Sequence, residues 1–201
     1  MEDHDLEPES TFKALGFFDI DLTGRTAQSV EFEQCRFRAA ILAGCQLTKV
    51  RITDCLVENC DWSNLHGDAG TIERAKLSDS RMTGLAWTDG LLRDVTFQQC
   101  KLDLTNWRMA SFDAAFFVDC NLSRADFTDA DLRGACFTRC NLTGAQFSKA
   151  SMQGARFRGC DLGGIGGITS WDGAVVHHDD LLALSYALAG ALGIVVEGAD
   201  D

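Results

Sequence analysis

The side chains in this sequence that could do chemistry are, first of all, its nine cysteines. Thiolates bind zinc, and paired thiols form disulfides or redox centres. The spacing supports none of these roles, because no CxxC occurs and the shortest separations are Cys136/Cys140 and Cys55/Cys60. An odd number of cysteines also leaves at least one unpaired. We therefore expect a structural explanation for the thiols.

Two adjacent histidines, His177 and His178, stand just before a predicted helix, with Asp172 nearby. One interpretation is a metal or catalytic site; the other is a helix cap with a solvated surface. Neighbouring side chains do not easily point at one ion, and the spacing places no third ligand. The cap is the favoured interpretation. We expect no catalytic residue, no metal and no cofactor.

A period of five residues organises the rest of the chain. Between Phe12 and Leu162, 29 of the 31 positions whose numbers end in 2 or 7 carry a large apolar residue, and the exceptions are Ala27 and Gly67. The positions ending in 0 or 5 carry small residues, and eight of the nine cysteines lie there. Only Cys136 is out of register. A free thiol packs like a small hydrophobic group, so this pattern accounts for the cysteines.

Two buried positions in every five, with turn-forming residues between them, indicate a chain that bends every five residues. Four bends close a square coil of 20 residues, and stacked coils pair as parallel strands do, at ~4.8 Å per coil. Residues 20 apart should therefore stack. One column is rich in phenylalanine and the next in leucine, as this coil requires: Phe97, Phe117, Phe137 and Phe157; Leu102, Leu122, Leu142 and Leu162.

The segments "ADLRG", "CNLTG", "ADFTD" and "CDLGG" resemble the pentapeptide-repeat family. The resemblance covers residues 12–162. It implies an all-β solenoid, a right-handed quadrilateral parallel β-helix, which agrees with the coil derived above; a C-terminal α-helix would cap it. The bacterial members it is similar to bind type II topoisomerases, chiefly gyrase, and confer tolerance to quinolones or toxins. Their proposed mechanism is mimicry of duplex DNA by an anionic rod.

The charge distribution gives mimicry little support. Of the net charge of −12, residues 1–11 contribute −5 and residues 163–201 contribute −6, which leaves −1 for the solenoid. No side of the square coil departs from neutrality by more than two charges. A local acidic cluster, Asp126, Asp129 and Asp131, is the candidate partner-binding site. The same neutrality argues against direct binding of nucleic acid, which needs a basic face.

Two departures from the period are further candidates. Residues 25–29 place Arg25 and Ala27 at positions expected to be buried, and residues 64–70 place Gly67 and Gly70 there. The second departure is either a projecting loop or a loose corner without a partner. It adds three candidate partner-binding residues: Asn64, His66 and Asp68.

After Leu162 the repeat ends, and the segment "DDLLALSYALAGALG" predicts a helix with Gly193 at its end. One apolar stripe of this helix contains Leu181, Leu184, Leu188 and Ala191. A second contains Leu182, Tyr186 and Ala189. Because a cap needs only one apolar face, we expect a homodimer through residues 175–196. The candidate interface is Leu181, Leu182, Leu184, Tyr186, Leu188 and Ala189.

The sequence thus predicts an acidic tail at 1–11, a repeat domain at 12–162, and a connector, capping helix and acidic tail at 163–201. The expected function is a non-enzymatic scaffold for protein interaction. The alternative is a protein that binds DNA gyrase or topoisomerase IV and protects it. An enzyme is disfavoured because no nucleophile–base motif or phosphate loop occurs. The acidic start and the absence of a long apolar run predict a cytoplasmic protein without membrane contact.

Overall fold

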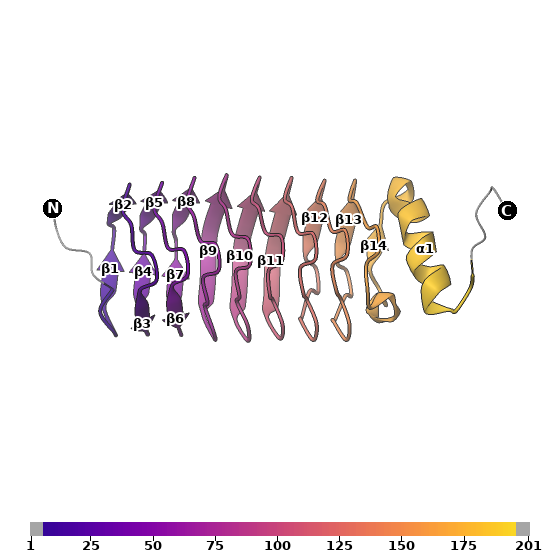
Figure 1. Cartoon of the computed structure of the whole chain (residues 1–201), viewed down its shortest axis with the longest axis horizontal. Helices are drawn as coiled ribbons and strands as arrows, with labels where there is room; N and C mark the ends of the chain where they lie inside the picture. The colour runs from indigo at the N-terminus through magenta and orange to yellow at the C-terminus, as the bar shows by residue number, and fades with distance from the viewer. Residues whose placement is uncertain (1–5, 196–201) are drawn as a thin grey trace.

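The computed structural model describes residues 6–195. They form a rod of stacked coils closed at one end by a helix (Figure 1). The strands are short, and their bounds are as follows: β1 Thr11–Lys13, β2 Gly16–Phe18, β3 Thr26–Gln28, β4 Glu31–Glu33, β5 Arg36–Arg38, β6 Gln46–Thr48, β7 Arg51–Thr53, β8 Leu56–Glu58, β9 Thr71–Ser78, β10 Leu91–Gln98, β11 Ser111–Val118, β12 Cys136–Thr138, β13 Arg156–Arg158 and β14 Val175–Val176. Two 3₁₀ turns, Ile168–Ser170 and His178–Asp180, precede helix α1, Leu181–Ala191.

All strand pairs are parallel, and the register from β1 to β13 is 20 residues. Phe12 pairs with Phe32 on one side and Phe17 with Phe37 on the next. The remaining sides are linked by single bridges and by the pair β3–β6, where Ala27 lies opposite Leu47. The expected right-handed quadrilateral β-helix, of about eight coils, is confirmed.

The interior is filled by the two residues of each pentad that the period of five singles out. Aromatic rings stack along the rod, with 4.8 Å between the centroids of Phe117 and Phe137 and again between Phe137 and Phe157. This distance is the coil spacing expected for paired strands. The rings also pack T-shaped against those of other sides, as Phe12 does against Phe17 on the adjacent side and Phe127 against Phe137 on the opposite one. The interior is therefore a continuous close-packed core.

Each corner is made by a residue in the left-handed conformation. Within residues 6–195, 24 non-glycine residues have positive φ, all at positions ending in 4 or 9. Most are polar or charged, such as Asn64, Asp89 and Asp129, and several other corners are glycine. Asn, Asp and Gly tolerate this conformation best, which explains the polar residues that separate the buried ones. The longer strands β9, β10 and β11 continue through one such corner.

The two ends of the rod are covered differently. At the N-terminal end Leu6, within the acidic tail expected at 1–11, is buried in the core, whereas residues 7–9 are exposed. At the other end the register shortens by one residue, because Phe157 pairs with Val176. Trp171 then stacks on Phe157 with 4.5 Å between ring centroids. An apolar side chain is needed at both ends because the outermost coils would otherwise expose their interior.

Helix α1 lies across the last coil (Figure 1). Leu184 is buried, and Ala183 and Ala187 pack beside it against the core. The carboxylate of Asp180, itself buried, accepts a hydrogen bond from the backbone N–H of Gly159 at 2.8 Å and fixes the start of the helix to the rod. Gly193, at φ 70°, follows the helix as expected. Among residues 6–195, no helix combines the length and hydropathy that crossing a membrane requires.

Candidate protein interaction surfaces

One side of the rod brings together most of the acidic and polar candidates. We call it the His66 side: the outward and corner residues of 44–49, 64–69, 84–89, 104–109, 124–129 and 144–149. Single bridges link His66 through Ala86 and Asn106 to Asp126 along this side. Asn64 and Asp68 flank His66, and Asp129 occupies a corner. Asp131 lies on the next side, bridged to Ser111 and Ser151.

Local hydrogen bonds hold several carboxylates of this region and lower the pKa of two of them, Asp126 and Asp131. Partial burial raises the pKa of Asp126, but hydrogen bonds from Thr128 and the Arg108 guanidinium outweigh it and lower that pKa. The Asp126 carboxylate lies 3.2 Å from the Arg108 guanidinium. A hydrogen bond from Arg133 likewise lowers the pKa of Asp131. Asp68 accepts a hydrogen bond from the Thr88 hydroxyl.

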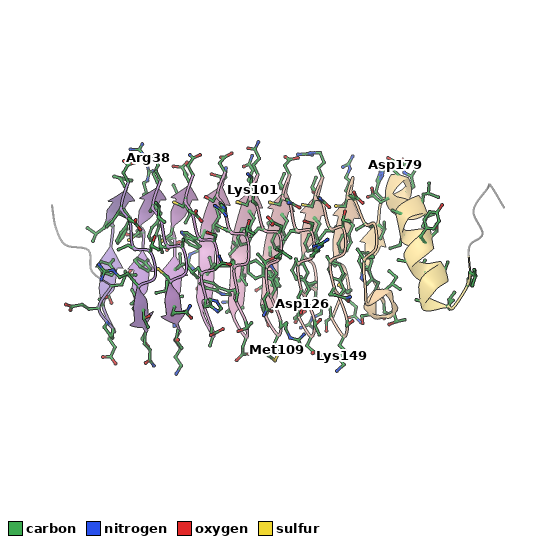
Figure 2. All side chains as sticks on the ribbon, in the orientation of Figure 1. Arg38, Lys101, Met109, Asp126, Lys149 and Asp179 are labelled. Carbon is green, nitrogen blue, oxygen red and sulfur yellow. The ribbon has the colours of Figure 1, made fainter. Side chains whose placement is uncertain are left out.

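The His66 side is nevertheless mixed in charge. Its acidic residues are interspersed with the bases of the ranges above, which are Lys49, Arg108, Arg124 and Lys149. Figure 2 shows Met109 and Lys149 at the lower edge of the rod, opposite Arg38, and Asp126 in the lower half of the rod. The mixture of signs supports local recognition of a protein surface better than a continuous negative stripe.

The departure at residues 64–70 is a regular part of the coil, so the projecting-loop interpretation is wrong. His66 is bridged to Gln46 and Ala86, and Gly67 and Gly70 are buried. The indole of Trp87, one coil later, occupies the space that these glycines leave. A Cβ atom on Gly67 would lie 2.2 Å from the Trp87 ring, and one on Gly70 would lie 2.6 Å from it. The Trp87 Nε1–H donates a hydrogen bond to the Gly70 carbonyl at 3.2 Å.

The departure at residues 25–29 is regular as well. Thr26–Gln28 forms strand β3 and pairs with β6, and Ala27 is buried opposite Leu47. Arg25 is exposed although its position in the pentad is normally buried. Neither departure projects from the rod, because the neighbouring coil supplies the missing volume in one and the small Ala27 still points inward in the other.

The second candidate surface is the outward face of α1. Leu182 and Tyr186 are 71% and 62% exposed, and Leu181, Leu188 and Leu192 are exposed beside them. Ala189 is half-buried. Leu184 was a candidate interface residue but is buried against the last coil, and the capping face consists of Ala183, Leu184 and Ala187. Small alanines let the helix lie close to the last coil, which turns the larger side chains outward.

The histidines form a cluster that the spacing did not reveal. One ligand atom from each of His177, His178 and Asp179 lies within 4.8 Å of the others. The Asp179 carboxylate is 3.1 Å from His177 Nδ1 and 2.7 Å from His178 Nε2. Asp172, which lies nearby in the sequence, is not part of this cluster. His177 Nδ1 also accepts a hydrogen bond from the backbone N–H of Asp179, which supports the helix-cap interpretation.

The cysteines are free thiols, and all except Cys136 are buried. Those at positions 100, 120, 140 and 160 form a column, and each donates to a backbone carbonyl of the preceding coil, as Cys120 does to Phe97 at 3.5 Å. Burial raises the pKa of Cys55 to about 12. The hydrogen bond with Cys100 raises the pKa of Cys120 to about 12. Cys55 and Cys120 are therefore packing groups held in their protonated form.

Thiol accessibility offers a direct check of this core. We expect Ellman's reagent to modify about one thiol of the nine in the native protein near neutral pH. The buried thiols should react at least about 100-fold more slowly than Cys136, because they need local unfolding before the reagent can reach them. Replacing Cys136 with serine should remove the native reaction. Rapid modification of several thiols in that variant would contradict the packing described.

Comparisons with known proteins identify the repeat. The family model described as pentapeptide repeat region matches residues 91–166, and the one described as pentapeptide repeats (8 copies) matches residues 17–54. Together they cover more than half of the chain. No curated protein matches the sequence significantly.

Several solved structures are similar. A trypsin-treated form of QnrB1, a plasmid-mediated fluoroquinolone resistance protein, is 19% identical with a TM-score of 0.46, over 94% of this chain and 99% of that one. HetL from Nostoc sp. strain PCC 7120, a pentapeptide repeat protein involved in heterocyst differentiation regulation, is 18% identical with a TM-score of 0.33, over 84% and 92%. A pentapeptide repeat protein from the Arabidopsis thaliana thylakoid lumen is 15% identical with a TM-score of 0.22, over 87% and 77%.

The repeat models match the N-terminal and the C-terminal parts of a solenoid whose pentads bury their apolar residues in register throughout. The chain belongs to the pentapeptide-repeat family.

Proposed function

We propose that the protein is a non-enzymatic scaffold for protein–protein interaction that dimerises through its C-terminal cap. The observation that carries the proposal is the outward face of α1, where Leu182 and Tyr186 are largely exposed although a cap needs only the inner face. The filled interior supports a binding role over catalysis, because stacked rings occupy the space in which a substrate would have to lie. The cytoplasmic location expected from the sequence stays a prediction.

Light scattering on the purified protein tests the dimer. We expect twice the mass of one chain at micromolar concentration, and a single-chain mass for the Leu182→Glu/Tyr186→Glu variant. Two carboxylates in an apolar contact would have to lose their hydration, which weakens association by on the order of 100-fold or more. Thr48→Glu, exposed and remote from the cap, is the control for added charge and should remain dimeric. A wild-type protein with the mass of one chain would refute the dimer.

The alternative partner is a type II topoisomerase, DNA gyrase or topoisomerase IV. The acidic residues gathered on the His66 side, Asp68, Asp126 and Asp129, favour this alternative. The bases on the same side oppose a duplex-like charge pattern. Gyrase supercoiling titrated with the pure protein, with and without ciprofloxacin, distinguishes the two. Inhibition or protection of gyrase would establish the topoisomerase as the partner. If excess protein neither inhibits nor protects gyrase, the topoisomerase is excluded and the scaffold has another partner.

A further inference from the structure

Two successive corners of one coil carry large apolar side chains in the left-handed conformation. Leu104 has φ 59° and Met109 has φ 58°. Within residues 6–195, every other non-glycine residue with positive φ is alanine or carries a polar or charged side chain. Bulky side chains are disfavoured in this conformation because Cβ approaches the following carbonyl oxygen. Leu104 and Met109 are therefore exceptions to the rule that makes the other corners.

The fold does not need either side chain. Leu104 is 54% and Met109 is 55% exposed, whereas the leucines of the interior are fully buried. The corners one coil away make the same turn with other residues: Gly84 and Arg124 in the column of Leu104, and Asp89 and Asp129 in that of Met109. Exposed apolar groups in an unfavourable backbone conformation weaken the isolated protein, so their presence points to a contact outside it.

Both residues border the His66 side. Leu104 stands at one corner of this side and Met109 at the other, with the outward residues Asn106 and Arg108 between them. Met109 projects from the edge of the rod near Asp126 and Lys149 (Figure 2). This arrangement, two apolar side chains separated and surrounded by polar ones, is typical of an interface hot spot with its polar rim.

The charges around Met109 indicate the kind of partner. Asp89 and Asp129 occupy the same corner column one coil to either side, ~4.8 Å along the rod. In the part of the chain that the structure describes, neither forms an ion pair, whereas Arg108 is paired with Asp126. A second copy docked about a two-fold axis at Met109 would bring these carboxylates together, and a nucleic acid would meet them with phosphates. Both are disfavoured by repulsion.

We propose that the His66 side, centred on Leu104 and Met109, is the docking surface for a different protein. That protein presents an apolar depression for each anchor, and lysine or arginine side chains border the depression that receives Met109. The inference rests on the proposed scaffold function but not on the dimer, since α1 lies at the end of the rod (Figure 1).

Photo-crosslinking in the native cells tests the surface with the full-length chain. A benzophenone amino acid at position 104 or 109 should capture one and the same protein. The control position is Gln99, a corner of the same coil at which φ is also positive but which does not border the His66 side. Capture of a second copy of this chain, or equal capture from position 99, would overturn the inference.

The captured protein, once purified, tests the chemistry. We expect Leu104→Asn/Met109→Asn to weaken its binding at least about tenfold. The pair Asp89→Asn/Asp129→Asn should weaken it by about threefold or more and reduce the salt dependence. Asparagine tolerates the corner conformation, so the midpoint of thermal unfolding should stay or rise by about 2 °C, which separates lost contact from lost fold. Unchanged affinity in the first variant would refute the anchors.

The outcome also separates this inference from the proposed function. If positions 104 and 109 capture nothing while benzophenone positions on the other three sides capture a different protein, the docking surface is wrong and the scaffold stands. If no position on any side captures another protein, the scaffold proposal fails together with the inference.

Discussion

Replacing Phe117 with alanine is expected to lower the free energy of unfolding by about 3–5 kcal/mol. Its ring is fully buried and lies between Phe97 and Phe137, at centroid distances of 5.0 and 4.8 Å. Alanine would leave a cavity in the middle of the stack, and the flanking coils, held by their strand pairing, could not collapse into it. Urea denaturation followed by circular dichroism measures the loss.

The adjacent Phe116 supplies the matched control. It belongs to the same strand β11 but points outward and is 43% exposed, so Phe116→Ala should change the free energy of unfolding by less than about 1 kcal/mol. Because the residues are neighbours and the chemical change is identical, the difference reports only the alternation of the strand. Equal losses in both variants would show that the register of β11 is not the one described.

The second large effect is expected at Trp87. Its indole fills the space left by Gly67, Gly70 and Gly90, so Trp87→Ala should cost about 3–5 kcal/mol. Gly67→Leu alone restores the residue type of the repeat, yet it should also destabilise the protein, by about 1–3 kcal/mol, because the indole already occupies that volume. Calorimetric or urea unfolding measures both.

The double variant makes this prediction specific. The introduced leucine side chain would have room in Gly67→Leu/Trp87→Ala, so the two losses should not add, and the coupling should favour the double variant by about 0.5–3 kcal/mol. Trp107, a fully buried tryptophan that is not among the nearest neighbours of Gly67, is the control: Gly67→Leu and Trp107→Ala should add. Additive losses in the first pair would mean that Trp87 does not fill the site of Gly67.

Much of the fold followed from the sequence because a solenoid turns spatial neighbours into a fixed sequence separation. The period of five predicted which side chains are buried, and the separation of 20 predicted which ones stack. The same rule could have identified the partner of Gly67, since Trp87 lies 20 residues later. It could also have placed His66 and Asp126 on one side, since 60 residues are three whole coils.

The rule failed where the period ends. Beyond Leu162 no fixed sequence separation links spatial neighbours. The pairing of Phe157 with Val176 and the inward orientation of Leu184 therefore could not be predicted from the sequence. The approach of Asp179 to both histidines depends on the 3₁₀ turn at His178–Asp180, which spacing does not predict. Burial of Leu6 was missed because a single apolar residue in an acidic segment carries no periodic signal.

The position of α1 decides how copies of this rod can assemble. A bare last coil would present a row of unpaired backbone N–H and C=O groups, and a second rod could add there by strand pairing. Such head-to-tail addition repeats at every new end and grows a filament. A helix satisfies its own backbone groups, so the end sealed by α1 offers only side chains. If two such helix faces contact each other, both are buried and neither can bind a third copy, so assembly stops at a closed pair.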